Sequence, residues 1–198
     1  MHKFAIIYYS RSNSVQKLAI EISKGIQSVN NNSDIKLICC TDAKNSMNEI
    51  NTADAIIFGS PTYFGSLASE MKAFFDYTGQ IFIERKWKNK IAAGFTHSSS
   101  LSGDKFLTLT QIMTFAMQQG MIWIGQDSLA NEFIEVPQEW SDLGDEKLEV
   151  NNLGSWIGLM SQSNSMKGIE ISKNDLFSAR LFGRRIGMIT TIQNKHCN

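Results

Sequence analysis

Short runs of consecutive apolar residues alternate along this chain with stretches in which apolar residues recur every three or four positions. The runs predict buried strands, because a strand covered on both faces needs no polar side. The recurring positions predict amphipathic helices between the strands. We place strands at residues 4–9, 35–40, 53–59, 90–95 and 121–125, and helices that start near Val15, Ser66, Asp104 and Ser172.

This alternation predicts an α/β fold in which a doubly wound, five-stranded parallel sheet carries helices on both faces. Right-handed crossovers restrict the topology, and we expect the strand order 2-1-3-4-5. In that order the loops after the first, third and fourth strands meet at the carboxyl edge of the sheet, where ligands bind in such folds. These loops are residues 10–15, 60–65 and 96–103.

The 198 residues suit one domain, 1–198. Residues 126–171 show no clear periodicity and are too long for an ordinary loop, so we expect an irregular insertion before the C-terminal helix. In the helix before that insertion, the spacing predicts a core-facing stripe made of Phe106, Leu109, Met113 and Met117.

The first loop has the composition of a phosphate site. It offers three hydroxyls, an amide and a guanidinium, and it opens directly into a helix. The first N–H groups of a helix lack intrahelical acceptors and the helix dipole is positive there, so an anion is stabilised. We predict cofactor contacts from Ser10, Arg11, Ser12, Asn13, Ser14 and Val15.

The second and third loops suit a flat ring. Tyr63 and Phe64 lie in a turn shaped by proline and glycine, and they could stack on a heterocycle whose edge the backbone amides address. The third loop offers hydroxyls and backbone to the other edge. A phosphate, a ring and a second ring edge together describe FMN. The predicted contacts are Pro61, Thr62, Tyr63, Phe64, Gly65, Thr96, His97, Ser98, Ser99, Ser100 and Gly103.

Charge and composition exclude several classes of function. Lysine plus arginine equals aspartate plus glutamate, at 19 each, which argues against an electrostatic nucleic-acid binder and against an acidic, diffusible electron carrier. Three cysteines without a CxxC pair predict reduced thiols and a cytoplasmic protein. No apolar window reaches transmembrane length, and the three histidines are too scattered for a metal site.

Simpler explanations exist for each loop. The first could be an ordinary turn with a serine cap, and Arg11 could be solvated. A lone loop histidine such as His97 is more often structural or exposed than a proton donor. Tyr63 and Phe64 could be core aromatics, although a Pro-Thr-Tyr-Phe-Gly turn is a poor place to bury both. The convergence of three loops favours a cofactor over these explanations.

Several segments resemble the flavodoxin-fold NAD(P)H:quinone oxidoreductases of the WrbA type. They are YYSRSNSVQKLA, DAIIFGSPTYFGSLASEMKAFFDYTG, KIAAGF and QQGMIWIG, with weaker likeness in LGSWIGLMSQS and ARLFGRRIG. The resemblance implies a flavodoxin-like fold, FMN as cofactor, NADH or NADPH as reductant and a quinone-like acceptor. It also implies a homodimer or homotetramer whose active site lies near subunit contacts.

The resemblance also assigns residues. A family histidine near the flavin falls on Gln118 and a family tryptophan near the substrate falls on Phe82, so these two and Arg11 are the expected substrate contacts. The family's first loop usually has glycine where this chain has Asn13, a residue type that tolerates a left-handed backbone. The family's third loop is glycine-rich, whereas this chain has SSSLSG.

We therefore expect an FMN-dependent oxidoreductase that moves two electrons from NAD(P)H to a quinone or similar flat acceptor. No side chain needs to be catalytic, because the flavin carries the chemistry. Two alternatives remain open: a flavodoxin-type one-electron carrier, and a flavin-free binding or regulatory protein on the same fold.

Overall fold

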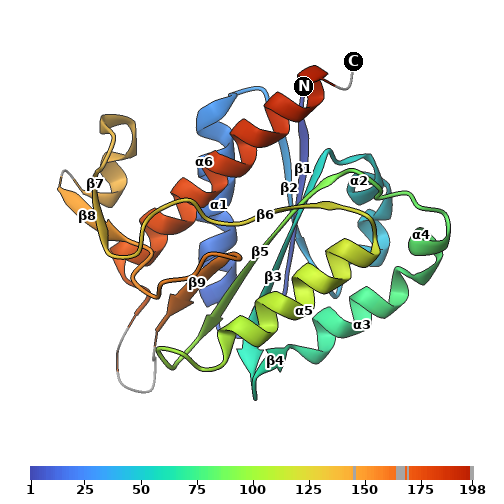
Figure 1. The fold of residues 1–198 in the computed structure, drawn as a ribbon, viewed down its shortest axis with the longest axis horizontal. Helices are drawn as coiled ribbons and strands as arrows, with labels where there is room; N and C mark the ends of the chain where they lie inside the picture. The colour runs from blue at the N-terminus through green and yellow to red at the C-terminus, as the bar shows by residue number, and fades with distance from the viewer. Residues whose placement is uncertain (145, 164–167, 169, 197–198) are drawn as a thin grey trace.

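A computed structural model describes residues 1–144, 146–163, 168 and 170–196. Its sheet contains a path of five parallel strands in the order β2-β1-β3-β5-β6, which confirms the predicted order (Figure 1). Each strand is bounded by polar or helical segments, as the apolar runs predict. The five strands are β1 (Lys3–Tyr8), β2 (Asp34–Cys39), β3 (Ala55–Tyr63), β5 (Ile91–Ser98) and β6 (Ile122–Ile124).

Helices cover both faces of this sheet (Figure 1). On one face α1 (Ser14–Val29) packs against α6 (Lys173–His196). On the other face lie α3 (Ser69–Tyr77) and α5 (Lys105–Gln118). Shorter helical segments complete the connections: η1 (Ala43–Ser46), α2 (Met47–Thr52) and α4 (Gly79–Ile83).

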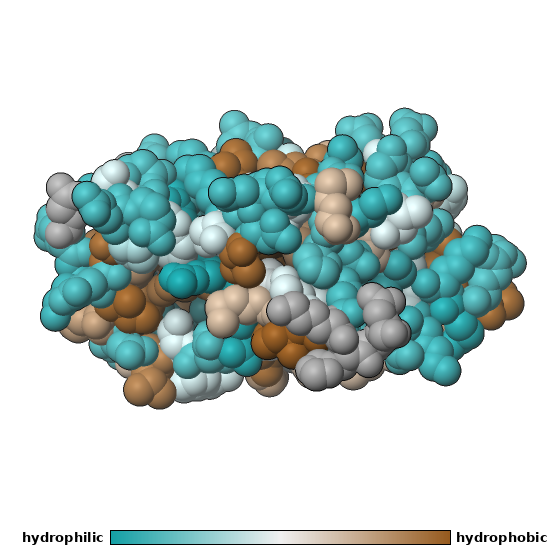
Figure 2. All heavy atoms as spheres, turned by 90° about the horizontal axis from the view of Figure 1, so that it is seen from above, coloured by the Kyte–Doolittle hydropathy of each residue, from teal (hydrophilic) through white to brown (hydrophobic). Residues whose placement is uncertain are grey.

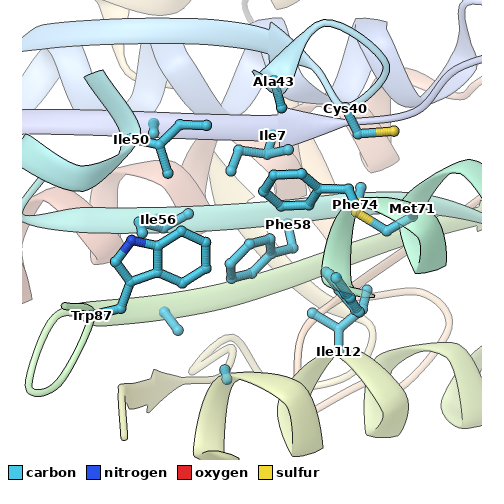
Figure 3. Close-up of a cluster of buried hydrophobic side chains, with 14 of the residues drawn as sticks. Ile7, Cys40, Ala43, Ile50, Ile56, Phe58, Met71, Phe74, Trp87 and Ile112 are labelled. Carbon is cyan, nitrogen blue, oxygen red and sulfur yellow. The ribbon is translucent and has the colours of Figure 1, made fainter. Parts of the chain in front are cut away.

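Two hydrophobic clusters hold these layers together. The cluster under α3 and α5 is rich in aromatic residues, with Phe58 of β3 among Phe75, Trp87 and Phe115 (Figure 3). The second cluster lies between the sheet and the α1–α6 pair, where Leu18 and Ile22 face α6 side chains such as Phe182. Burial of this apolar area at about 25 cal/mol per Å² supplies the main stabilising term of the fold.

The predicted stripe on α5 is correct at Leu109, which is buried, and wrong at Phe106 and Met117, which are 58% and 47% exposed. The buried residues of this helix are Lys105, Thr108, Leu109, Ile112 and Ala116. The spacing of apolar residues predicted the wrong face of the helix at Phe106 and Met117, because the buried face includes a lysine and a threonine, which are not apolar. Their polar atoms are hydrogen-bonded at the carboxyl edge of the sheet, so burial is tolerated there.

β3 and β5 are longer than expected, so part of the predicted second and third loops is strand. Pro61 faces His97 across the β3–β5 ladder. β3 then turns into the antiparallel strand β4 (Ser66–Leu67), and the prediction that Ser66 caps a helix is wrong, because α3 begins at Ser69.

Residues 126–171 are more regular than expected. They contain the antiparallel hairpin β7 (Glu132–Glu135) and β8 (Lys147–Val150), the segment η2 (Gln138–Leu143), and β9 (Leu159–Gln162). β9 extends the main sheet by pairing in parallel with the end of β5. The hairpin region packs on α6 through Trp140 and Phe177, whose rings meet edge to face at 5.9 Å.

Exposed hydrophobic side chains form separate groups among hydrophilic ones on the face shown in Figure 2. Within the described part of the chain, no helix is long and apolar enough to cross a membrane.

Candidate functional site

The three predicted loops share one edge of the sheet. β1, β3 and β5 are consecutive neighbours, with Tyr8 opposite Gly59 and Ser60 opposite Thr96. Both chain termini lie at the opposite end of the fold from β4 (Figure 1). The structure therefore brings residues 10–15, the β3–β4 turn and the end of β5 together, as a doubly wound topology requires.

The first loop leaves helix amides available to an anion. Asn13 has φ 62°, the left-handed conformation in which asparagine is tolerated. Gln16 N donates to Ser10 Oγ at 3.2 Å and Lys17 N to the Asn13 carbonyl at 2.9 Å. The N–H groups of Ser14 and Val15 precede that first helical bond, so the helix itself offers them no acceptor.

A hydrogen bond to α3 positions the end of β1, which leads into this loop. Glu70, in the first turn of α3, accepts a hydrogen bond from the Tyr9 hydroxyl, which raises the pKa of Tyr9 to about 12. The same bond lowers the pKa of Glu70. Tyr9 thus stays a neutral donor at physiological pH and joins the end of β1 to α3. Arg11 and Ser12, just beyond it, are exposed.

The second loop presents its aromatic rings to solvent. Tyr63 is 40% exposed and Phe64 is fully exposed, so neither is a core residue. Phe64 has φ 50° and Gly65 has φ 73°. A bulky residue in the left-handed region is strained by about 1–2 kcal/mol. An exposed aromatic ring held at that cost has no packing role, and it is available to stack on a ligand.

Threonine hydroxyls below this loop are used inside the protein. Thr62 Oγ1 lies 2.8 Å from both Thr96 Oγ1 and Thr108 Oγ1. Thr96 Oγ1 donates to the Ser60 carbonyl at 2.7 Å. Ser60 Oγ accepts from Ala68 N at 2.9 Å. All these hydroxyls are buried, so any cofactor contact at Thr62 and Thr96 has to come from their backbone.

His97 is buried and fully engaged. Its Nδ1 lies 2.8 Å from Ser161 Oγ and its Nε2 lies 3.0 Å from Ser163 Oγ. Burial, with the nearby Lys105 charge, lowers the pKa of His97 to about 4, so the ring is neutral at physiological pH. The imidazole joins β5 to β9 and its following residue, and it does not point into open space.

The carbonyl groups of the third loop accept hydrogen bonds from residues elsewhere in the fold. The Ser98 carbonyl accepts from Ser163 N at 3.4 Å and the Ser99 carbonyl from Gln162 Nε2 at 3.1 Å. The Ser100 carbonyl accepts from Lys105 Nζ. Gly103 has φ 56°, a left-handed conformation that favours glycine, and a Cβ there would lie 2.6 Å from Ser98 Oγ.

Two buried ionisable side chains next to this loop were not anticipated. Lys105 is 0% exposed, and burial lowers its pKa to about 8. Asp175, in the first turn of α6, is 6% exposed, and burial raises its pKa to about 6. A lysine in the first turn of a helix is disfavoured by the helix dipole, and that misplacement was the one available sequence signal.

The predicted substrate contacts do not lie together. Arg11 is in the first loop, whereas Phe82 and Gln118 line one end of a groove of about 520 Å³ that runs along α5 and reaches Leu67 of β4. Gln118 is thirteen residues along α5 from Lys105, or about 20 Å at 1.5 Å per residue. Phe82 is 46% exposed. The groove therefore extends to the strand that follows the second loop, while Gln118 lies at the opposite end of α5 from the third loop.

The described residues contain no cluster of side chains of the kind that holds a metal ion. Across residues 1–144, 146–163, 168 and 170–196, no group of three histidine, cysteine, aspartate or glutamate side chains could hold an ion. Cys40 is buried, and its pKa is raised to about 12, mainly by desolvation, so its thiol is unreactive.

Comparison with known proteins agrees with the geometry of the loops. Residues 29–135 match the NADPH-dependent FMN reductase family. The chain is 31% identical over 195 residues to "Flavodoxin FldP" of Pseudomonas aeruginosa, covering 96% of this chain and 97% of that protein. It is 30% identical over 149 residues to an "NAD(P)H dehydrogenase (quinone)" of Geobacter sulfurreducens, covering 75% and 68%.

A solved structure extends the likeness to three dimensions. The "flavodoxin, WrbA-like protein" of Agrobacterium tumefaciens superposes with a TM-score of 0.71 at 27% identity, covering 97% of this chain and 99% of that one. The family match spans more than half of the chain and includes the second and third loops. On these grounds the protein belongs to the NADPH-dependent FMN reductase family.

Proposed function

We propose that this protein is an FMN-dependent oxidoreductase that transfers two electrons from NADH or NADPH to a quinone or similar flat acceptor. The observation that carries the proposal is the shared edge of β1, β3 and β5, at which the start of α1 and the exposed aromatic rings of the β3–β4 turn both lie. When bound, FMN supplies the redox chemistry, because its ring accepts hydride and releases electrons in pairs.

The residues present fit such a group. The Ser14 and Val15 amides and the hydroxyls of Ser10, Ser12 and Ser14 would hold the phosphate. Arg11, which is exposed beside them, would neutralise its charge. Tyr63 and Phe64 would stack on the ring and limit access of water to it. The backbone of Ser99, Ser100 and Leu101 would address the ring edge. No side chain here has to donate or remove a proton during turnover.

The nicotinamide and the acceptor would use the same open face in turn. This arrangement needs no separate dinucleotide-binding loop. The names of relatives, "NAD(P)H dehydrogenase (quinone)" among them, support this assignment of reductant and acceptor.

Subunit association would bring in the remaining predicted contacts. Phe82 and Gln118 line the end of the groove that lies farthest along α5 from the third loop of their own chain. In a homodimer or homotetramer, that groove could approach the site of a neighbouring copy. Light scattering on the purified protein tests this: a monomer at micromolar concentration would remove both residues from the substrate site.

The second candidate function is a flavodoxin-type one-electron carrier. It is favoured by the 31% identity to "Flavodoxin FldP" along almost the entire chain. Against it stand the zero net charge and the added hairpin and β9. An acidic docking surface for basic partners would require an excess of carboxylates.

One experiment separates these candidates. FMN-reconstituted protein is titrated with NADH and NADPH without oxygen, followed by flavin absorbance, and then mixed with benzoquinone. Bleaching in one two-electron step that quinone reverses supports the reductase. Bound FMN that neither nicotinamide bleaches, and that holds a long-lived half-reduced form with dithionite, indicates the carrier. Failure to bind FMN at all would contradict both.

A further inference from the structure

The position of Lys105 is unusual for a lysine in two respects. Its side chain is 0% exposed, although lysine is almost never fully buried. It also occupies the first position of α5, where the helix dipole disfavours a cation. Natural sequences keep such locally unfavourable choices mainly at functional sites. The surroundings of its ammonium group indicate which function is served.

The ammonium group acts on the third loop. Lys105 Nζ donates to Ser98 Oγ at 3.0 Å and to the Ser100 carbonyl. Gln162 holds the intervening carbonyl of Ser99 at 3.1 Å. Three consecutive carbonyls, those of Ser98, Ser99 and Ser100, therefore accept bonds from groups outside the loop, on α5, on β9 and just after β9.

This pattern determines where the loop amides point. In a trans peptide the N–H points opposite to the preceding C=O. Because the three carbonyls are held in this way, the N–H groups of Ser99, Ser100 and Leu101 each point away from the donor that holds the preceding carbonyl. Adjacent N–H groups turned away from their supports can form a donor surface for an electron-rich ring edge.

Asp175 fixes the position of Gln162. Its Oδ2 accepts from Gln162 N at 2.9 Å, so the residue that holds Ser99 is itself fixed to the start of α6. The nearby Asp175 charge also favours the charged form of Lys105, against the effect of burial. Lys105, Gln162 and Asp175 are hereafter called the loop clamp.

We propose that Lys105 is a positioning residue for the flavin ring, holding Ser98–Ser100 with their donor surface toward the ring edge and placing a buried positive charge behind it. The inference rests on the proposed function. A ring that gains a hydride, and thus two electrons and one proton, becomes an anion. The Lys105 charge stabilises that anion relative to the neutral oxidised ring. The clamp takes the place of the glycine-rich loop expected from the resemblance.

The test compares a buried and a partly buried lysine that flank the same strand, β5. Lys105→Met keeps the length of the side chain and removes its charge. The matched control is Lys90→Met, because Lys90 precedes β5 at the opposite edge of the sheet, is partly buried and donates to the Ala53 carbonyl. For each protein we would measure the Kd for FMN and for riboflavin by flavin fluorescence, and the midpoint potential of bound FMN.

Lys105→Met is expected to raise both Kd values by the same factor, about tenfold, because the charge-assisted bonds that hold the loop beside the ring are lost while the phosphate contacts are untouched. The midpoint potential is expected to fall. Lys90→Met is expected to leave both Kd values and the midpoint potential unchanged. Two results would overturn the inference: Kd values within twofold of wild type together with an unchanged midpoint potential in Lys105→Met, or an equal shift of these quantities in Lys90→Met.

A second variant keeps the test decisive if Lys105→Met does not fold. Gln162→Leu removes the donor to the Ser99 carbonyl and leaves the lysine charge in place. It is expected to weaken both flavins equally and leave the potential near wild type; unchanged affinity for both would contradict the positioning role. Failure of the wild-type protein to bind FMN would instead contradict the proposed function.

Discussion

Thr62 Oγ1 and Thr96 Oγ1 lie 2.8 Å apart and join the carboxyl ends of β3 and β5 at the edge that carries the proposed FMN site. Each hydroxyl has a further buried partner: Thr108 Oγ1 for Thr62, and the Ser60 carbonyl for Thr96. The second and third loops therefore have a common support, although they are 34 residues apart in the chain.

Thr96→Val is expected to lower the free energy of unfolding by about 1–3 kcal/mol, because the shape is kept while the Ser60 carbonyl and the Thr62 hydroxyl lose a buried partner. Urea unfolding monitored by tryptophan fluorescence measures the loss. Thr110→Val is the control, since Thr110 bonds only the Phe106 carbonyl of its own helix and is partly exposed. Equal losses in the two variants would contradict a specific role for the network.

Phe64→Gly is expected to stabilise the protein without flavin and, at the same time, to weaken its binding of FMN. Glycine relieves the strain of the left-handed conformation, so the protein without flavin gains about 1 kcal/mol. The exposed ring contributes no packing that could be lost. If Phe64 stacks on the flavin, the Kd for FMN rises. Melting temperature and FMN titration on the same variant measure both effects; a loss of stability with unchanged affinity would refute this account of the residue.

Arg180→Met is expected to destabilise the protein by about 3–5 kcal/mol. The guanidinium is 2% exposed and binds Glu21 of α1 at 2.8 Å and Asp142 of η2 at 2.6 and 2.7 Å. Its removal would leave the buried Glu21 with only the half-exposed Lys24 as a counter-charge. It would also remove the link that Arg180 makes between η2 and the α1–α6 pair.

The control for that variant lies on the same helix. Arg185→Met removes the ion pair with Asp127, whose side chain is 59% exposed. Exposed pairs contribute about 1 kcal/mol or less. Denaturant unfolding of both variants gives the comparison, and similar losses at positions 180 and 185 would show that the buried network carries no special weight.

The lowered pKa of His97 predicts that the free energy of unfolding decreases in acid. Its folded-state pKa of about 4 is below the ordinary value of 6.5. Between these values the unfolded chain binds a proton that the folded chain does not, so the free energy of unfolding falls as pH falls from 6.5 to 4. The full effect is about 3 kcal/mol at 1.36 kcal/mol per pKa unit.

His97→Gln isolates this effect, because Asp175 acts in the opposite direction. The raised Asp175 pKa of about 6 means that the folded chain takes up a proton first there, which adds stability as pH falls. Urea unfolding at several pH values between 4 and 7 therefore compares variant with wild type. The difference between the two proteins should shrink as pH falls; profiles that stay parallel would show that His97 does not titrate as described.

Much of the architecture followed from the sequence alone. Buried strands are nearly continuous apolar runs, and helices that cover a sheet repeat every three to four residues, so the parallel order β2-β1-β3-β5-β6 could be predicted. The convergence of three loops follows from that order. The left-handed Asn13 was also accessible, because few residue types adopt that conformation.

The supports of the site depended on the tertiary structure. His97 meets Ser163 across 66 residues, and the loop clamp joins α5, β9 and α6. The cost of burying a polar group depends on which partner reaches it, and partners distant in sequence leave no local pattern. For the same reason Lys105 and Thr108 concealed the true buried face of α5. The sequence by itself determined the order of the strands and the position of the loops; the folded chain alone decided how those loops are held.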